Sequence, residues 1–496
     1  MPTISSSISD FFALVMPYLL TFGPLILQLS ALTLIPERRK PAAAQAWLLL
    51  IFLTPVIGWI VYLLIGSPKL SRRRREIQRR ANQAIVDRMR AIQREEANAH
   101  LHTPRLGRRL AGLVRMSQKL GGMPAFGGNT VEFLPDYNGT IKRIAEAIDA
   151  AKRYVHIEYY ALVLDAATEC VFAAMERAVE RGVKVRVLYD HLGSLAYKPY
   201  KAMQARLAAA GIESHRMLAV DPIHKEWSRL DLRNHRKIVI IDGRIGFTGS
   251  QNMVLKTYHG QGDLVYEELV ACVSGPVVAQ LQAVFATDWF CETSVVLDDA
   301  HFSEIAGEFA PAGDMLAQVL PSGSAYESEN NLRLFIALLH SAQRKAVITT
   351  PYFVPDDGLL SAITIAAERG VDVTLIVSGV SDQWVVSRAQ RSYYEELLEA
   401  GVKIRLFNPP VMLHAKNMSI DDDIAAIGSS NMDMRSFQLN LEITLVLYDR
   451  EAVARLRAVE ASYLARSTPV LLEEWRRQSF GEKFIQNSAR LVSALL

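Results

Sequence analysis

The chain has 496 residues, of which 50% are hydrophobic and 22% charged, and its formal net charge is +3. This length suits two or three domains, and this composition excludes a largely disordered chain. Three widely separated cysteines, Cys170, Cys272 and Cys291, exclude a disulfide framework and lack the paired spacing of a zinc site, which indicates a reducing compartment.

Two apolar runs open the chain. Residues 11–35 and 42–66 each give 25 positions without Asp, Glu, Lys or Arg. Such a run is long enough to cross about 30 Å of hydrocarbon. We therefore predict a transmembrane hairpin over residues 1–68, although prolines in both runs also permit a re-entrant shape. A cleaved signal peptide is disfavoured because no Lys or Arg precedes the first run.

A basic belt follows the apolar runs. Residues 69–118 carry 14 Lys or Arg against four acids, whereas residues 119–496 sum to −8. Basic residues beside the second run favour a cytoplasmic position for both chain ends, although the connection at residues 36–41 is also basic and opposes this orientation. Apolar residues at three- or four-residue steps predict an amphipathic linker helix over residues 69–118. This helix would either lie on anionic lipid or be a solvated connection.

Beyond residue 119 the sequence repeats itself once. The segment AVERGVKVRVLYD at residues 178–190 matches AAERGVDVTLIVS at residues 366–378. Each copy alternates β-branched runs with Ala-rich helical patterns, which predicts a mixed or parallel sheet covered by helices. We expect two α/β domains side by side, at residues 119–305 and 306–496.

Each copy contains the same motif near its end. HRKIVIIDGRIGFTGSQN begins at His235, and HAKNMSIDDDIAAIGSSN begins at His414. Two such matches in equivalent places of an internal repeat are a specific signal, although one alone would be weak. The shared positions are His235, Lys237, Asp242, Ser250 and Asn252 in the first copy, and His414, Lys416, Asp421, Ser429 and Asn431 in the second.

These residue types suit a phosphate site. Residues two apart on a strand point to one face, so each His and its Lys can project into one site. Two histidines, two lysines and two asparagines offer donors and positive charge for a phosphate, and the lysines make a metal or other cofactor unnecessary. Asp242 and Asp421 stand at turn signals and are either site or turn residues. Tyr160 and Tyr352, at strand ends, either line an entrance or belong to the core.

The motifs resemble the HKD signature of the phospholipase D superfamily. The chain is similar to one branch, the bacterial cardiolipin synthases, over almost its whole length: in the N-terminal apolar hairpin, in RNHRKIVIIDG and TPYFVPDD, and in LHAK followed by GSSNMDMRS. The resemblance implies a pseudo-twofold pair of α/β domains with one active site at their interface. One histidine would form a phosphohistidine, while the other protonates the leaving alkoxide and deprotonates the incoming hydroxyl.

The resemblance also implies an acidic residue after each GSxN that orients the histidine through its other ring nitrogen. In the second copy this residue matches Glu442. In the first copy Glu268 fits by the strand that follows it, Asp263 fits by spacing, and Glu267 is a further candidate; we favour Glu268. Arg435, in MDMRS, would meet a lipid phosphate or pair with a local acid.

The implied activity is the transfer of a phosphatidyl group from one phosphatidylglycerol to another, with release of glycerol. The enzyme would lie in the bacterial inner (cytoplasmic) membrane, with phosphatidylglycerol and anionic lipids as partners and its catalytic domains on the cytoplasmic side. Hydrolysis, or transfer to another alcohol, is the alternative. A nuclease is disfavoured because the acidic residues 119–496 do not suit nucleic acid. A non-catalytic lipid-binding scaffold is disfavoured because both motifs are complete.

Overall fold

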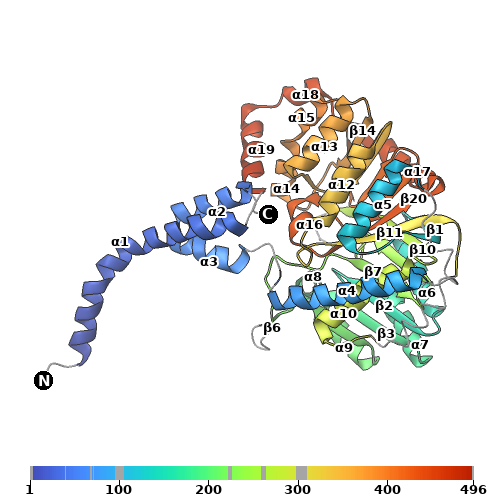
Figure 1. Cartoon of the computed structure of the whole chain (residues 1–496), viewed down its shortest axis with the longest axis horizontal. Coiled ribbons are helices and arrows are strands. Elements are labelled where there is room, and N and C mark those ends of the chain that lie inside the picture. Colours follow the sequence, from blue (N-terminus) through green and yellow to red (C-terminus); the bar gives the residue numbers. More distant parts are fainter. Residues whose placement is uncertain are drawn as a thin grey trace. The chain divides into compact units, whose positions relative to one another are not determined.

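The computed structural model describes residues 4–38, 41–66, 70, 72–94, 106–221, 226–258, 264–297 and 310–493. The chain divides into two compact units (Figure 1). The N-terminal unit comprises Met1–Lys69 with Leu491–Leu496, and the large unit comprises Leu70–Arg490.

The N-terminal unit contains the helices α1 (Ile4–Arg38), α2 (Pro41–Leu53) and α3 (Pro55–Ile65). The second apolar run is therefore not one helix, because Pro55 begins a new one. α3 folds back on α2, so that the rings of Trp47 and Tyr62 lie 5.4 Å apart in edge-on contact. No helix among the described residues combines the length and the apolar character needed to cross a membrane. The predicted transmembrane hairpin stays a prediction.

The basic belt forms two helices, α4 (Arg72–Arg94) and α5 (Arg108–Gly121), rather than one linker. Both pack on the body of the large unit. In α4, Met89 is buried, and Arg74 forms an ion pair with Glu292 of α10 (Val278–Thr293). In α5, Val114 is buried in the core beneath the sheet. The buried face of α4 is therefore in contact with protein. Arg79 and Arg80 on its other side are 69% and 78% exposed, and contact of this basic face with anionic lipid stays a prediction.

A mixed sheet of 15 strands forms the large unit, in the order β21-β15-β14-β12-β17-β18-β20-β11-β1-β10-β8-β7-β2-β3-β4. Its two halves meet where β1 and β11 pair antiparallel. The first half contains β1 (Phe126–Leu134), β2 (Tyr154–Tyr159), β3 (Lys184–Asp190), β4 (Glu213–Met217), β7 (Lys237–Ile241), β8 (Ile245–Gly249) and β10 (Val270–Ser274). The second contains β11 (Met315–Ser322), β12 (Lys345–Thr350), β14 (Asp372–Ser378), β15 (Lys403–Phe407), β17 (Asn417–Ile420), β18 (Ile424–Gly428), β20 (Glu442–Tyr448) and β21 (Ser467–Pro469).

Outward from β1 and β11 the strand order is the same in both halves, as the sequence repeat predicts, and the second half adds β21 at its edge. In the first half β2, β3 and β4 are parallel and β7 is antiparallel to β2; in the second β12, β14 and β15 are parallel and β17 is antiparallel to β12. Short pairs lie outside this sheet: β5 (Val220–Asp221) with β6 (Glu226–Trp227), β9 (Val265–Glu267) with β16 (Val411–Leu413), and β13 (Phe353–Val354) with β19 (Met432–Asp433). The prediction of a mixed sheet built from two related halves is confirmed.

Helices flank the sheet on both sides (Figure 1). The first half carries α6 (Tyr137–Asp149), α7 (Glu169–Glu180), α8 (His191–Leu195), α9 (Tyr200–Ala209) and α10. The second carries α12 (Asn330–Ser341), α13 (Asp357–Glu368), α14 (Trp384–Arg391), α15 (Tyr394–Glu399), α16 (Met434–Gln438), α17 (Arg450–Ala465), α18 (Leu472–Arg476) and α19 (Phe480–Ser493). Side chains alternate along each strand, so Ile238 and Ile240 of β7 enter one core while Val239 and Ile241 enter another. Both faces of this strand are therefore buried, which fixes the position of the residues at its ends.

Candidate active site

The two motif histidines lie where the halves of the large unit meet. His235 stands just before β7, and His414 stands just before β17. The backbone N–H of His235 donates to Leu441 O at 2.8 Å, and that of His414 donates to Glu267 O at 2.7 Å. Each histidine therefore bonds to the backbone of the other half. The parallel pairing of β9, from the first half, with β16, from the second, adds further contacts between the halves. The two motifs form one composite site.

A carboxylate from the opposite half holds each imidazole. His235 Nδ1 lies 3.0 Å from both carboxylate oxygens of Glu442. His414 Nδ1 lies 2.7 Å from Oε1 of Glu268. The sequence pointed to these two glutamates but assigned Glu268 to His235 and Glu442 to His414. The structure corrects this assignment. The carbonyl that accepts from His235 belongs to Leu441, directly before Glu442, and the carbonyl that accepts from His414 belongs to Glu267, directly before Glu268.

The remaining acidic candidates have other positions. Asp263 lies outside the described residues. Glu267 forms an ion pair with Arg466, whose side chain is 47% exposed. Glu267 thus bonds to His414 only through its backbone carbonyl, and its side chain binds Arg466 instead.

The two carboxylates differ in how completely they are bonded. Ser429 Oγ donates to Glu442, whereas its counterpart Ser250 donates to a backbone carbonyl at 3.1 Å. Burial alone would raise the pKa of Glu442, but its interactions with His235, Lys237 and Ser429 outweigh burial and lower it. Oε2 of Glu268 has no hydrogen-bond partner among the described residues. Glu442 is therefore the more firmly held of the two.

Both imidazoles are neutral in the free protein near pH 7. Burial lowers the pKa of His235 to about 4, against the opposing effect of Glu442. Burial also lowers the pKa of His414, which Glu268 opposes. Because each Nδ1 faces a carboxylate, Nδ1 carries the proton and Nε2 keeps its lone pair. Each histidine can thus act as a nucleophile or as a base through Nε2.

A buried lysine accompanies each histidine. Lys237 Nζ donates to His235 O at 2.7 Å, and Lys416 Nζ donates to His414 O at 2.6 Å. Burial lowers the pKa of Lys237 to about 7 and that of Lys416 to about 8. The charge of Lys416 adds to the shift of Lys237, so the two ammonium groups lie within electrostatic range of each other. Neither has an ion pair among the described residues, which leaves their positive charge for an anion.

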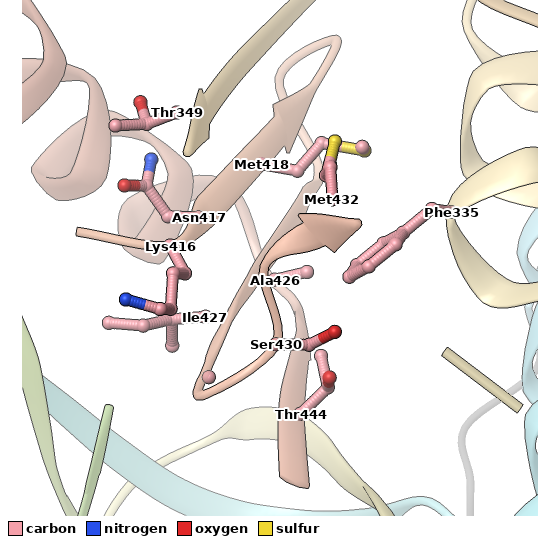
Figure 2. A pocket seen from close by; sticks show the side chains of 11 residues that line it. Phe335, Thr349, Lys416, Asn417, Met418, Ala426, Ile427, Ser430, Met432 and Thr444 are labelled. Atoms are coloured by element: carbon pink, nitrogen blue, oxygen red, sulfur yellow. The ribbon is translucent and has the colours of Figure 1, made fainter. Parts of the chain in front are cut away.

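The surroundings of Lys416 are tightly packed. Figure 2 shows Lys416, which precedes β17, and Asn417 and Met418 of β17 beside a cavity that Phe335 and Met432 also line. The cavity has a volume of about 10 Å³, which is close to the space that one water molecule needs. It is too small for a lipid headgroup, and it is therefore distinct from a substrate pocket.

The motif asparagines lie at the same end of the sheet as the histidines. Asn252 follows β8, the antiparallel neighbour of β7, and Asn431 follows β18, the neighbour of β17. Both side chains are buried, and both Oδ1 atoms are without a hydrogen-bond partner in the part of the chain that the structure describes. An amide oxygen is an acceptor and cannot bond to a phosphate oxygen, so a phosphate contact would use the Nδ2 donors, and the phosphate-binding role of the two asparagines stays a prediction.

Asp242 and Asp421 lie at the far ends of β7 and β17, away from the histidines. The Asp242 carboxylate accepts the backbone N–H groups of residues 152–154 at 2.8–2.9 Å. The Asp421 carboxylate accepts those of residues 343–345 at 2.8–3.2 Å. Both residues have a left-handed backbone, with φ of 53° and 47°. This corrects the interpretation of these aspartates as catalytic in favour of the turn alternative.

Asp421→Ala is expected to lower the free energy of unfolding by about 2–4 kcal/mol, because three backbone donors lose their acceptor and Ala strains the left-handed backbone. Turnover per folded molecule should stay within twofold of the parent. Urea unfolding and an activity assay on the same sample check both statements, with Asp421→Asn as the matched control. A stably folded Ala variant with a hundredfold lower turnover would restore the catalytic interpretation.

Aromatic rings surround the two imidazoles. Tyr160 packs edge-on against His235 with ring centres 5.1 Å apart. Tyr266 and Tyr352 contact His414 in the same manner at 5.7 Å and 6.2 Å. The sequence left Tyr160 and Tyr352 open between entrance and core and did not identify Tyr266. No local pattern marks Tyr266, because its contact with His414 depends on the exchange between halves.

Comparison with known proteins gives two matches to protein families. The family described as "Cardiolipin synthase, PLD-like domain" matches residues 144–289 and 335–461, one segment in each half. The family described as "Phospholipase_D-nuclease N-terminal" matches residues 25–67. The first match includes both histidines, both lysines and both glutamates of the site.

Similar proteins extend over nearly the whole chain. Cardiolipin synthase A of Proteus mirabilis is 33% identical over 93% of this chain and 94% of its own length. Cardiolipin synthase A of Pectobacterium carotovorum is 33% identical over 98% and 99%, and the cardiolipin synthase of Alkalihalophilus pseudofirmus is 34% identical over 93% and 90%. A crystal structure of phosphatidylserine synthase from Haemophilus influenzae shares the fold, with a TM-score of 0.58 and 16% identity over 78% of this chain and 100% of that one.

Proposed function

We infer the reaction from one premise: the chain belongs to the family of cardiolipin synthases with PLD-like domains. It is a phosphatidyltransferase that joins two phosphatidylglycerol molecules into cardiolipin and releases glycerol. The observation that supports this best is the composite site, where two carboxylate-bound imidazoles and two lysines lie within electrostatic range of one another. The exchange of one phosphodiester for another is nearly isoenergetic, so the reaction needs no ATP.

In the first step, Nε2 of one histidine attacks the phosphorus of the donor phosphatidylglycerol. A P–N bond forms, the P–O bond to the glycerol headgroup breaks, and the other histidine gives its proton to the departing glycerol oxygen. That histidine must be protonated when the donor binds. The negative phosphate favours this state, since a nearby anion raises the pKa of an imidazole.

In the second step, the histidine that lost its proton accepts one from a hydroxyl of the second phosphatidylglycerol. The hydroxyl oxygen attacks phosphorus, the P–N bond breaks, and cardiolipin forms. Lys237 and Lys416 offset the negative charge on the non-bridging oxygens in both steps. The carboxylates of Glu442 and Glu268 stabilise each imidazolium as it forms.

Hydrolysis and transfer to a different alcohol would use the same first step. Quantifying the products of phosphatidylglycerol in mixed micelles separates these reactions. A transferase releases one glycerol per cardiolipin, whereas a hydrolase releases glycerol with phosphatidic acid. Phosphatidic acid as the sole lipid product would overturn the assignment.

Binding of the phosphodiester headgroup is expected to weaken at least tenfold between pH 6 and pH 9. The pKa values of Lys237 and Lys416, lowered by burial to about 7 and about 8, place the loss of both positive charges within this range. The charged form binds the anion, so affinity falls as pH rises. Calorimetric titration with glycerophosphoglycerol checks this, and Lys237→Arg, which stays charged, should flatten the profile. Constant affinity up to pH 9 would contradict the role of the lysines.

The N-terminal unit associates with the membrane in this proposal. Its helices expose large apolar side chains to an unusual extent, and Leu53 and Leu63 are each 73% exposed. Further exposed apolar residues are Leu25, Ile26, Leu29, Leu32, Leu49, Phe52, Val56, Ile57, Ile60 and Leu64. Residues 25–67 also match the family described as "Phospholipase_D-nuclease N-terminal". This unit would hold the enzyme at the bacterial cytoplasmic membrane; quantitative release of the wild type by high salt alone would refute the proposal.

A further inference from the structure

A half-buried cation stands beside the composite site and has no part in the two steps above. Arg435 lies four residues after Asn431, at the start of the short helix α16. The pseudo-symmetric position in the first half, four residues after Asn252, is Lys256. Both copies thus place a basic residue at the same distance from the motif asparagine.

The guanidinium of Arg435 is not used in an ion pair. Among the residues that the structure describes, no carboxylate lies within ion-pair distance of it, and its single hydrogen bond is a long one, 3.4 Å to Asp231 O. Asp433 is close in sequence, but its carboxylate caps α16 by accepting the N–H of Ser436 at 2.8 Å. Among the described residues Arg435 therefore forms no direct ion pair with a local acid, although its charge opposes the effect of burial on the pKa of Asp433.

Arg435 is within electrostatic range of the site. Burial raises the pKa of Tyr160, and the charge of Arg435 opposes that shift. The Tyr160 ring in turn packs against His235, and Lys237 Nζ lies 5.5 Å from its centre. Asp231, whose carbonyl Arg435 contacts, is only four residues before His235. The charge of Arg435 therefore acts on a tyrosine that packs directly against His235.

The proposed reaction requires two phosphate sites. The donor phosphate occupies the space between the two histidines and takes up the charge of Lys237 and Lys416. The acceptor is also a phosphatidylglycerol, and its own phosphate is separated from the attacking hydroxyl by the three carbons of glycerol. A second cation outside the histidine pair would offset this charge. An arginine suits the task, because its planar donors bind phosphate oxygens in pairs and it stays charged at every relevant pH.

We propose that Arg435 binds the phosphate of the acceptor phosphatidylglycerol and thereby selects an anionic lipid over water or a neutral alcohol as acceptor. The proposal rests on the proposed function and adds a specificity-determining residue to it.

The test compares two acceptors in one reaction. Phosphatidylglycerol in mixed micelles is incubated with a fixed concentration of ethanol, and mass spectrometry gives the ratio of cardiolipin to phosphatidylethanol. Arg435→Gln should lower this ratio at least tenfold, because only the lipid acceptor has a phosphate for Arg435 to bind, and ethanol does not. Arg435→Lys should restore part of the ratio, since it keeps the charge but not the paired donors. Lys256→Gln is the matched control and should change the ratio less than twofold.

Several results would overturn the inference. One is a parallel loss of both products in Arg435→Gln and Arg435→Lys, since this places the effect on the donor or on folding, which thermal unfolding of each variant reports. Another is an unchanged ratio in Arg435→Gln, and a third is a loss of ratio in Lys256→Gln but not in Arg435→Gln. Absence of both products from the wild type would overturn the proposed function itself, and with it this inference.

Discussion

His235→Ala and His414→Ala are each expected to lower cardiolipin formation by on the order of 10⁴-fold. One variant lacks the nucleophile that forms the P–N bond, and the other lacks the group that moves the proton. Both imidazoles are buried where the halves meet, so removal of either leaves a small cavity without breaking a strand. Initial rates of product formation with phosphatidylglycerol check this expectation, and far-ultraviolet circular dichroism confirms the fold of each variant.

A donor with p-nitrophenol in place of glycerol separates the two roles. This leaving group departs without a proton, so the variant that lacks the general acid should release p-nitrophenol far faster than it releases glycerol. The variant that lacks the nucleophile should stay inactive with both donors. Full activity of either variant with phosphatidylglycerol would exclude that histidine from the reaction.

The exchange of glutamates between halves predicts a specific pattern of coupling. Glu442→Gln and Glu268→Gln should each lower turnover by on the order of 10²–10⁴-fold, because each histidine loses the charge that stabilises its imidazolium. In urea unfolding, the double-mutant cycle of His235→Ala with Glu442→Gln should give a coupling energy of about 1–3 kcal/mol. The cycle of His235→Ala with Glu268→Gln is the matched control and should give a value near zero.

The opposite pattern would contradict this pairing. Strong coupling of His235 with Glu268, together with none to Glu442, would mean that each half orients its own histidine. The same two cycles built on His414→Ala provide an independent repetition, with the expected partners reversed.

Much of the fold was accessible from the sequence, because its signals are local. The repeat at residues 178–190 and 366–378 predicted related strands and helices, and both copies have them. The spacing of His235 to Lys237, and of His414 to Lys416, predicts that each pair projects from one face of a strand; the structure places both histidines just before their strands. Hydrophobic periodicity and residue spacing determine such features within about ten residues.

Features that depend on contacts between distant segments were not accessible. The pairing of His235 with Glu442 spans 207 residues and follows from the backbone hydrogen bonds that join the two halves. Tyr266 was overlooked for the same reason. The role of Asp242 depends on which end of β7 lies beside the other half. His235 precedes this strand and Asp242 follows it, and the spacing of the motif does not tell which end that is. The helix break at Pro55 does not follow from the sequence alone, because a proline in an apolar run is compatible with a continuous and with an interrupted helix.

Trapping the covalent intermediate tests the central claim most directly. The enzyme is mixed with isotopically labelled phosphatidylglycerol, quenched under conditions that preserve phosphohistidine, digested, and mapped by mass spectrometry. We predict a phosphatidyl adduct on His235 or His414 that a chase with unlabelled phosphatidylglycerol converts into half-labelled cardiolipin. An adduct on any other residue, or a chase that yields only phosphatidic acid, would contradict a two-histidine phosphatidyltransferase.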